Sequence, residues 1–282
     1  MSQPSAVLAK YKVRPKKRLG QNFLDDENAL NQIASAAGIS KEDHVLEIGA
    51  GIGNLSILLA EKAGKFYALE KDNSLEKILK KTLVKSDNSK IIISDILQFN
   101  LDSIYKDKKL IVVGNLPYYI TSPILLHLIK QKTCIKTILI TVQKEVAKRI
   151  TASAGNKDYG RLSCLLQFYA KAELLEIFPK RLFIPQPNVD SALVKLDILD
   201  SPSIDVKSEE MFFKVVKAIF SHRRKTLLNS MLASGSLGLS KEVLGKTLEQ
   251  HGISPAIRGE QLSLKEIGKL ADAFDLVIKK IK

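Results

Sequence analysis

Over the first 200 residues, short apolar runs alternate with segments in which apolar positions recur every three or four residues. A continuous apolar run is typical of a strand buried on both faces, and the wider spacing is typical of a helix with one buried face. Strands are predicted at residues 45–49, 66–70, 91–94, 110–114 and 137–142, and helices at residues 54–62, 73–83, 123–131 and 143–152. This alternation indicates parallel βαβ units in an open, doubly wound α/β sheet.

The pattern changes twice towards the C-terminus. Residues 172–178 and 191–198, with three prolines between them, predict a two-stranded antiparallel extension that closes the sheet. Beyond residue 200, only helical spacing remains, at residues 209–220, 225–232, 241–250 and 263–278. We therefore expect a mainly parallel seven-stranded sheet flanked by helices, followed by a small C-terminal all-α domain. The expected divisions are an N-terminal arm at 1–20, the sheet domain at 21–200 and the helical domain at 201–282.

Charge is the informative part of the composition. The chain of 282 residues holds 44 Lys and Arg against 30 Asp and Glu, a formal net charge of +14. Residues 1–20 carry six basic side chains and no acid, residues 180–282 carry an excess of five, and the centre is nearly balanced. Such a chain attracts polyanions: nucleic acid, an anionic membrane face or an acidic protein.

Several classes are disfavoured by what the sequence lacks. No apolar run approaches the ~18 residues that cross a bilayer, and the apolar stretch at residues 6–9 is too short for a signal peptide. Cys134 and Cys164 have no CxxC spacing, and the four histidines have no metal-ligand spacing. We expect a cytoplasmic protein with no membrane contact, no metal and no obligate protein partner, acting as a monomer.

A glycine cluster, Glu-Ile-Gly-Ala-Gly-Ile-Gly at residues 47–53, separates the first predicted strand from its helix. Nucleotide-like ligands bind at this edge of a parallel sheet. Glu70 ends the second strand, 21 residues after Gly49, where a carboxylate can accept hydrogen bonds from ribose hydroxyls. A close-packed turn and a nicotinamide dehydrogenase both remain possible from these residues alone.

Two further positions favour a methyltransferase over a dehydrogenase. Asn54 stands where the dinucleotide fingerprint has its third glycine, and Asp95 ends the third strand. A carboxylate there can accept a hydrogen bond from an adenine amino group. Gly49, Gly51, Glu70 and Asp95 together indicate the S-adenosylmethionine pocket of Rossmann-like methyltransferases, although Asp95 taken alone is more typical of a helix N-cap.

The segment Asn115-Leu116-Pro117-Tyr118 follows the fourth strand and carries specific chemistry. The exocyclic amine of adenine is a poor nucleophile because its lone pair is delocalised into the ring. Acceptors such as the Asn115 side-chain oxygen and the Leu116 carbonyl can draw it towards a pyramidal geometry, while Pro117 stiffens the loop and Tyr118 offers a face for stacking. The structural alternative is a proline turn with its tyrosines in the core.

The order of these motifs resembles that of the ribosomal RNA adenine dimethyltransferases, over residues 20 to about 230. The similar segments are residues 20–24, 47–53, 114–118, 143–146, 159–162 and 183–192, with Glu70 and Asp95. The resemblance implies a Rossmann-like class I methyltransferase fold and S-adenosyl-L-methionine as cofactor. It also implies dimethylation of two adjacent adenosines near the 3′ end of 16S rRNA in the small ribosomal subunit or its precursor, linked to ribosome biogenesis.

The resemblance also assigns residues. It places the cofactor against Gln21, Asn22, Leu24, Gly49, Gly51, Glu70, Asp95 and Asn115, and the base against Asn115, Leu116, Pro117, Tyr118 and Phe183. Without it, Gln21 and Asn22 form a turn entering a helix at residues 25–37, and Phe183 is a core side chain. Expected rRNA contacts are Lys16, Lys17 and Arg18 in the arm and Arg223, Arg224 and Lys225 at the start of a helix; a solvated charged face is the alternative.

Three other functions remain open. A branch of the same family dimethylates 23S rRNA, but the long helical tail and the proline-rich segment at 183–192 favour the small-subunit branch. A mitochondrial relative would need an Arg- and Ser-rich presequence, which the Lys-rich arm is not. A non-enzymatic ribosome-assembly or transcription factor could use the same scaffold, although the intact segment from Asn115 to Tyr118 favours an enzyme.

Overall fold

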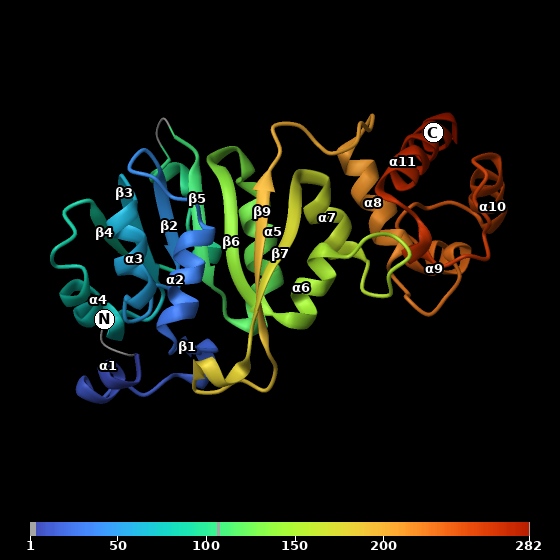
Figure 1. The fold of residues 1–282 in the computed structure, drawn as a ribbon. Coiled ribbons are helices and arrows are strands. Elements are labelled where there is room, and N and C mark those ends of the chain that lie inside the picture. Colours follow the sequence, from blue (N-terminus) through green and yellow to red (C-terminus); the bar gives the residue numbers. More distant parts are fainter. Residues whose placement is uncertain (1–3, 106–107, 282) are drawn as a thin grey trace. The chain divides into compact units, whose positions relative to one another are not determined.

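The computed structural model describes residues 4–105 and 108–281 of the chain. For Pro4 and Lys17 it describes the backbone only. It divides into two compact units. The first comprises Met1–Ala147 and Lys171–Ile198, and the second comprises Lys148–Ala170 and Leu199–Lys282. The first unit contains the sheet, and the second is helical (Figure 1).

A seven-stranded sheet forms the centre of the first unit. Its strands are β2 (His44–Ile48), β3 (Lys65–Glu70), β4 (Ser89–Ile93), β5 (Leu110–Asn115), β6 (Ile135–Gln143), β7 (Ala170–Phe178) and β9 (Ser191–Ile198). Their spatial order is β4-β3-β2-β5-β6-β9-β7. The strands from β4 to β6 are parallel to one another, and β9 is antiparallel to β6. The predicted mainly parallel seven-stranded sheet is confirmed.

The order of the strands determines where a ligand can bind. The chain winds outward from β2 through β3 to β4, and then returns to β5 on the other side of β2. Every residue of β2 is buried, as expected for a central strand covered on both faces. The crevice outside the carboxyl ends of β2 and β5, where the winding reverses, is the general ligand site of such sheets.

Helices cover both faces of this sheet. They are α2 (Glu27–Ala36), α3 (Asn54–Lys62), α4 (Glu76–Thr82) and α5 (Thr121–Lys130); the first unit also holds α1 (Pro4–Lys10) and the start of α6 (Lys144–Thr151). Figure 1 shows α2 and α3 in front of the sheet and α5 behind it. The bounds of α3 match the prediction, and Leu55, Leu59 and Ala60 form its buried apolar side. By contrast, α1 lies in the segment expected to be an arm; its Leu8 packs against Ile52, Leu75 and Ile78.

A second, two-stranded sheet joins distant parts of the first unit. Strand β1 (Phe23–Leu24) is antiparallel to β8 (Phe183–Ile184), with Phe23 opposite Ile184 and Leu24 opposite Phe183. Strands this short carry no periodicity, so the sequence did not predict them. The pairing fixes the segment before α2 against the proline-rich segment.

The second unit contains α7 (Arg161–Tyr169), α8 (Glu209–Ile219), α9 (Leu227–Ser234), α10 (Lys241–Gln250) and α11 (Leu264–Ile281). Its boundary differs from the expected division at residue 200, because residues 148–170 group with the C-terminal helices. The reason is aromatic packing: the Phe168 ring of α7 stacks on Phe212 of α8, with centroids 4.5 Å apart. The expected C-terminal helices are present.

Candidate active site

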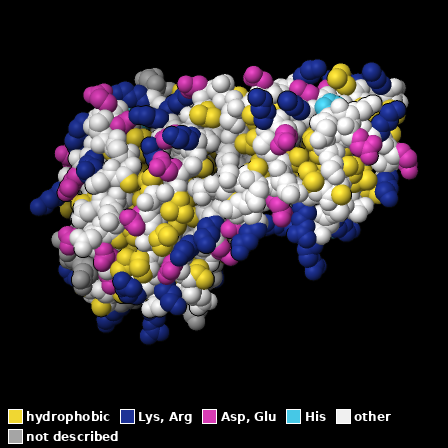
Figure 2. Space-filling model, turned by 45° about the vertical axis from the view of Figure 1, so that its right-hand side comes forward, with side chains coloured by type: hydrophobic (Ala, Val, Ile, Leu, Met, Phe, Trp, Pro, Cys, Tyr) yellow, Lys and Arg dark blue, Asp and Glu magenta, His cyan; other side chains and the backbone are white. Residues whose placement is uncertain are grey.

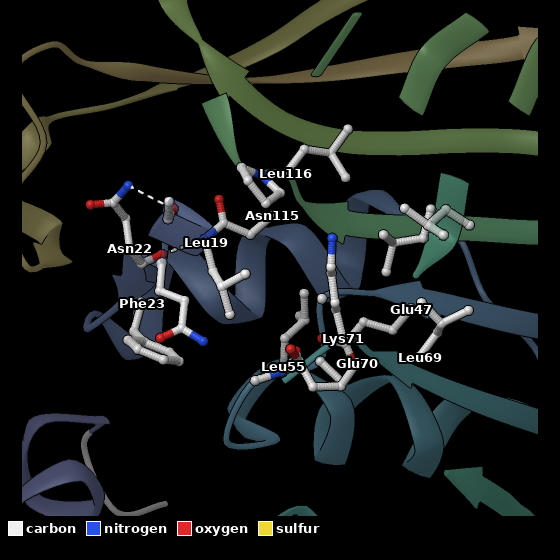
Figure 3. A pocket seen from close by; sticks show the side chains of 18 of the residues that line it. Leu19, Asn22, Phe23, Glu47, Leu55, Leu69, Glu70, Lys71, Asn115 and Leu116 are labelled. Atoms are coloured by element: carbon white, nitrogen blue, oxygen red, sulfur yellow. Dashed lines mark hydrogen bonds between the residues drawn. The ribbon is translucent and has the colours of Figure 1, made fainter. Parts of the chain in front are cut away.

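A pocket lies at the carboxyl ends of β2, β3, β4 and β5 and contains about 1120 Å³ of empty space, counted out to its open mouth. Every residue predicted to bind the cofactor lines it: Gln21, Asn22, Leu24, Gly49, Gly51, Glu70, Asp95 and Asn115. Leu116, Pro117 and Tyr118 line it as well. In Figure 3 the labelled side chains come from β2, from β3 and the residue after it, from β5 and the residue after it, from α3, and from the segment before α2. The structure therefore brings the glycine loop, both acids and the Asn115–Tyr118 segment together.

Glu70 is hydrogen-bonded to the glycine loop. The backbone N–H of Gly51 donates to its Oε2 at 2.8 Å, and that of Asp72 donates to its Oε1 at 2.7 Å. Gly49 and Gly51 have φ of 75° and 59°, a left-handed conformation that side chains other than glycine rarely adopt. Burial raises the pKa of Glu70 above its ordinary value, although these two hydrogen bonds oppose the rise. A carboxylate has about four acceptor positions, so Glu70 can accept a ligand hydroxyl in addition to these N–H groups.

Glu47 is an acid of this pocket that the sequence reasoning missed. It lies in β2, is 3% exposed, and accepts a hydrogen bond from the Ser56 hydroxyl at 2.5 Å. Burial raises its pKa to about 8, and the neighbouring charge of Glu70 adds to the effect. The available signal was a single acid inside an otherwise apolar strand, since a buried carboxyl needs a special reason to be there.

Asp95 caps a turn, as one of its two expectations has it, and lies where the other, contact with the cofactor's adenine, would need it. Its Oδ1 accepts a hydrogen bond from the Leu97 N–H at 3.0 Å and so caps a 3₁₀ turn at Ile96–Gln98, and its carboxylate also lines the pocket. Its Oδ2 accepts a hydrogen bond from the ammonium of Lys71 at 2.7 Å. Burial alone would raise the pKa of Asp95, but the Lys71 and Leu97 contacts hold it below its ordinary value. Lys71 was not predicted as a pocket residue.

Asn115 ends β5, and its amide has a defined orientation. The Nδ2 group donates a hydrogen bond to the backbone carbonyl of Asn22 at 2.8 Å (Figure 3). The Asn22 side chain in turn donates to the Gly20 carbonyl at 3.2 Å. Because the nitrogen of Asn115 is used in this way, its side-chain oxygen is directed away from Asn22 and is the acceptor that it offers.

The residues after Asn115 are held from several sides. The Leu116 N–H donates to the Thr141 carbonyl at 3.1 Å, and its side chain is buried. The Tyr118 hydroxyl is 2.6 Å from the Ser191 hydroxyl of β9, and burial raises the pKa of Tyr118. The loop is therefore fixed by β6 and β9, as a site that orients a reacting amine requires.

Lys16 and Gln21 attach the N-terminal segment to the pocket. The Lys16 ammonium is 2.6 Å from Oδ1 of Asp72, and Nε2 of Gln21 donates to Oδ2 at 3.0 Å. The backbone N–H of Lys16 also donates to Oε1 of Gln21 at 2.8 Å. These contacts oppose the effect of burial and lower the pKa of Asp72 to about 2. Lys16 therefore holds the segment in place, and its expected phosphate contact stays a prediction.

Phe183 does not lie in the pocket. It is 1% exposed and packs in the apolar core with Leu24, its partner across the β1–β8 pair. The expected role as a second aromatic face for the base is not supported, because its ring is covered on all sides. Core packing, the alternative open at the level of sequence, describes its position.

The basic residues of the second unit lie in a turn. Arg223, Arg224 and Lys225 precede α9, which begins at Leu227, so the expectation that they open a helix is wrong. All three are exposed, and the Arg223 guanidinium donates to the Lys157 carbonyl. In the first unit Arg18 is exposed, and the side chain of Lys17 lies outside the described residues. On the face seen in Figure 2, Lys and Arg side chains are dispersed among acidic ones.

No group of three or more His, Cys, Asp or Glu side chains in residues 4–105 and 108–281 could hold a metal ion. None of the helices within those ranges has the length and apolarity needed to cross a membrane.

The sheet order, the glycine loop and the acids at the ends of β3 and β4 define a Rossmann-like, S-adenosylmethionine-dependent methyltransferase. The residues present fit that cofactor: the carboxylates of Glu70 and Asp95 line the pocket as hydrogen-bond acceptors, and Gly49 and Gly51 carry no side chain to obstruct a ligand. Residues 13–272 match the model of the family described as Ribosomal RNA adenine dimethylase, and the chain belongs to that family. It is an rRNA adenine dimethyltransferase.

Similar proteins agree with this assignment. "Ribosomal RNA small subunit methyltransferase A" of Lactococcus lactis subsp. lactis is 46% identical over 279 residues, 97% of this chain and 94% of the relative. The structure of a dimethyladenosine transferase from Plasmodium falciparum is 25% identical, with a TM-score of 0.76 over 88% of this chain and 95% of that one. The structure of the 23S rRNA methyltransferase ErmE is 26% identical, with a TM-score of 0.70 over 90% of this chain and 99% of that one.

Proposed function

We propose that this enzyme dimethylates the exocyclic amines of two adjacent adenosines near the 3′ end of 16S rRNA, within the small ribosomal subunit or its precursor. The name of the Lactococcus relative, at 46% identity over nearly the whole chain, supports the small subunit as the substrate. The observation that carries the chemistry is the fixed amide of Asn115, whose nitrogen is bonded to Asn22 and whose oxygen is left for the substrate.

The cofactor would lie along the carboxyl ends of the strands. Glu70 would accept hydrogen bonds from its ribose hydroxyls, and Asp95 would accept one from its adenine amine. Gln21, Asn22 and Leu24 would cover its methionine end, with Gly49 and Gly51 beneath it. S-adenosylmethionine supplies a methyl group on a sulfonium, which is already a strong electrophile.

The remaining task of the protein is to position and polarise the target amine. The Asn115 side-chain oxygen and the Leu116 carbonyl would accept its two hydrogens, which returns lone-pair density to the nitrogen. Tyr118 would stack on the adenine, and Pro117 would hold the direction of the Leu116 carbonyl. The methylated ammonium loses its proton readily to water, so no general base is required. The monomethylated base must fit the same site for the second transfer.

The RNA would be held by exposed cations. Arg18 in the N-terminal arm and Arg224 and Lys225 before α9 are exposed and suited to phosphate contact. Accordingly, the first unit would hold the cofactor and the base, and the helical unit would grip rRNA. We further propose that the enzyme acts as a monomer in the cytoplasm during ribosome biogenesis. Light scattering of the purified protein tests the monomer.

Undermethylated small subunits incubated with methyl-labelled S-adenosylmethionine test the proposal. We expect four methyl groups per subunit, confined to two adjacent adenosines near the 3′ end of 16S rRNA. If methyl label entered large ribosomal subunits and not small ones, the enzyme would belong to the branch of the family that acts on 23S rRNA. Tight binding of small subunits without incorporation, under conditions where the cofactor binds, would instead favour a non-enzymatic assembly factor.

A further inference from the structure

Tyr119 differs from its neighbour Tyr118 in being free to meet a ligand. Both line the pocket, but the Tyr118 hydroxyl is bonded to Ser191, whereas the Tyr119 side chain is 56% exposed. Single exposed apolar residues are ordinary on protein surfaces. Tyr119 is distinguished by its place beside the amine-orienting loop, at the edge of the pocket.

The Tyr119 ring packs closely against Gly20. A Cβ atom built on Gly20 would lie 3.0 Å from both Cδ1 and Cε1 of the ring and 3.4 Å from Cβ of Pro117. Any other residue at position 20 would therefore push the ring away. The ring contacts the backbone of the segment that covers the cofactor site, and much of its surface is left to solvent.

A positive charge lies near this exposed ring. The half-exposed Lys71 side chain lines the pocket together with Tyr119, and its ammonium is 2.7 Å from Oδ2 of Asp95. Figure 3 shows the Lys71 side chain extending across the pocket towards the Asn115–Leu116 segment. An exposed aromatic face at the edge of the pocket suits a nucleotide, because a base can stack on it.

We propose that Tyr119 binds the nucleobase next to the target adenosine. This inference rests on the proposed function, in which a base of an RNA strand enters the pocket beside Tyr118. The neighbouring nucleotide is joined to the target by one phosphodiester, so it must lie at the mouth of the pocket, where the Tyr119 ring is exposed. Stacking there would hold the strand in a splayed conformation and would be tolerant of base identity.

Steady-state methylation of undermethylated small subunits tests the contact. Tyr119→Ala should lower kcat/KM by about 5- to 160-fold, the range expected for loss of one stacked base, and Tyr119→Phe should stay within about twofold of wild type. Affinity for S-adenosylhomocysteine should not change in either variant. Ile177→Ala, which trims a 40% exposed apolar side chain of β7, is the matched control and should be silent.

A second substrate separates stacking from local packing. In subunits reconstituted with an abasic nucleotide beside the target, wild type should lose activity and Tyr119→Ala should lose no more, since both changes remove the same contact. Equal losses in both backgrounds, or a Tyr119→Ala variant equal to wild type on natural subunits, would overturn the proposal.

A binding measurement distinguishes failure of this inference from failure of the proposed function. With 2-aminopurine at the neighbouring position and S-adenosylhomocysteine present, wild type and Tyr119→Phe should quench the fluorescence of the bound subunit, and Tyr119→Ala should not. Quenching without methyl transfer would refute the proposed function alone. Methyl transfer with quenching that does not depend on Tyr119 would refute the stacking contact alone.

Discussion

The side-chain amide of Asn115 donates a hydrogen bond to the backbone carbonyl of Asn22 at 2.8 Å, across a sequence separation of 93 residues. This bond joins the loop proposed to orient the amine to the segment proposed to cover the cofactor. It also determines which end of the amide faces the substrate. The Asn115 side chain therefore joins the proposed base-binding loop to the proposed cofactor-binding segment.

Replacing Asn115 tests that connection. Asn115→Ala should lower kcat for methyl transfer by about 100-fold or more, the usual cost of removing one preorganised polar contact to a reacting group. Asn115→Asp retains an oxygen but has no N–H for Asn22, so we expect a comparable loss. Single-turnover assays with undermethylated subunits measure the rate, and equilibrium dialysis measures cofactor affinity, which should change only a few-fold.

Asn31→Ala provides the control for Asn115. Asn31 lies on α2 and bonds only its own helix, through the Glu27 carbonyl, among the contacts the structure gives for its side chain. It should leave both the rate and the cofactor affinity unaltered. If Asn115→Ala turned over nearly as fast as wild type, the proposed role of Asn115 in orienting the target amine would be wrong.

Glu70→Gln should weaken cofactor binding with little effect on RNA affinity. In wild type both carboxylate oxygens accept backbone N–H groups, from Gly51 and Asp72. An amide at this position must direct its own N–H₂ towards one of these donors, which disturbs the glycine loop as well as the ribose contact. We expect the Kd for S-adenosylhomocysteine to rise by about 10- to 100-fold, since each lost buried hydrogen bond costs about 1–3 kcal/mol. Calorimetry measures it, and Glu76→Gln, at a partly exposed residue of α4, is the control.

The spacing of apolar residues predicted the helices and strands whose buried faces it records directly. The helix at residues 54–62 and the strand at 191–198 have the predicted bounds, because burial on one or both faces is recorded in their apolar spacing. α1 was missed because its apolar residues matter only once Ile52 and α4 are beside them. The β1–β8 pair was missed because two-residue strands have no period.

The candidate site shows the same division. The glycine loop, Glu70, Asp95 and the Asn115–Tyr118 segment were predicted, since each follows a strand whose carboxyl end meets one edge of the sheet. The position of Phe183 could not be predicted, because burial in the core depends on a long-range strand pair. The Lys71–Asp95 ion pair could not be predicted either, since it depends on side-chain geometry after two neighbouring strands.

The buried carboxyl of Glu47 should make stability depend on pH. Burial raises its pKa from 4.5 in the unfolded chain to about 8 in the fold. The native state therefore holds this proton more tightly, so the associated stability is complete below pH 4.5 and is lost as pH rises to about 8. The slope approaches about 1.4 kcal/mol per pH unit where the native group is neutral and the unfolded one is ionised.

Glu47→Gln isolates this effect because glutamine cannot ionise. The unfolding free energy of wild type relative to Glu47→Gln should fall between pH 5 and pH 8 and level off by pH 9, as measured by urea denaturation. The same comparison with Glu210→Gln, an exposed residue of α8, should show no such fall. A difference between wild type and Glu47→Gln that is constant with pH would show that Glu47 is ionised throughout.

Asp72→Asn should loosen the N-terminal segment. Asp72 accepts hydrogen bonds from Lys16 and Gln21, so the neutral amide loses the ion pair and one acceptor. Trypsin cleavage at Lys10 or Lys12 should become several-fold faster, as followed by mass spectrometry, because cleavage requires local opening. Glu76→Gln, which removes an exposed pair with Lys80, should not alter the cleavage rate.

The turn before α9 should contribute to RNA affinity in a salt-dependent way. Arg224 and Lys225 are exposed, and replacing both with Ala removes two candidate phosphate contacts while leaving the Arg223 bond to Lys157 in place. Each lost contact to single-stranded RNA should reduce the slope of log Kobs against log salt by about 0.7, so the double variant should reduce it by about 1.4.

Filter binding of undermethylated subunits between 50 and 300 mM salt, roughly the range over which such contacts are screened, measures that slope. Lys214→Ala is the control within the same unit, since its charge is already paired with Glu210 at 2.7 Å and it should leave the slope unchanged. A double variant that weakens binding equally at every salt concentration would show that the turn acts by shape. Because Asn115 and Tyr118 lie in the other unit, the same variant should retain wild-type kcat once the substrate saturates.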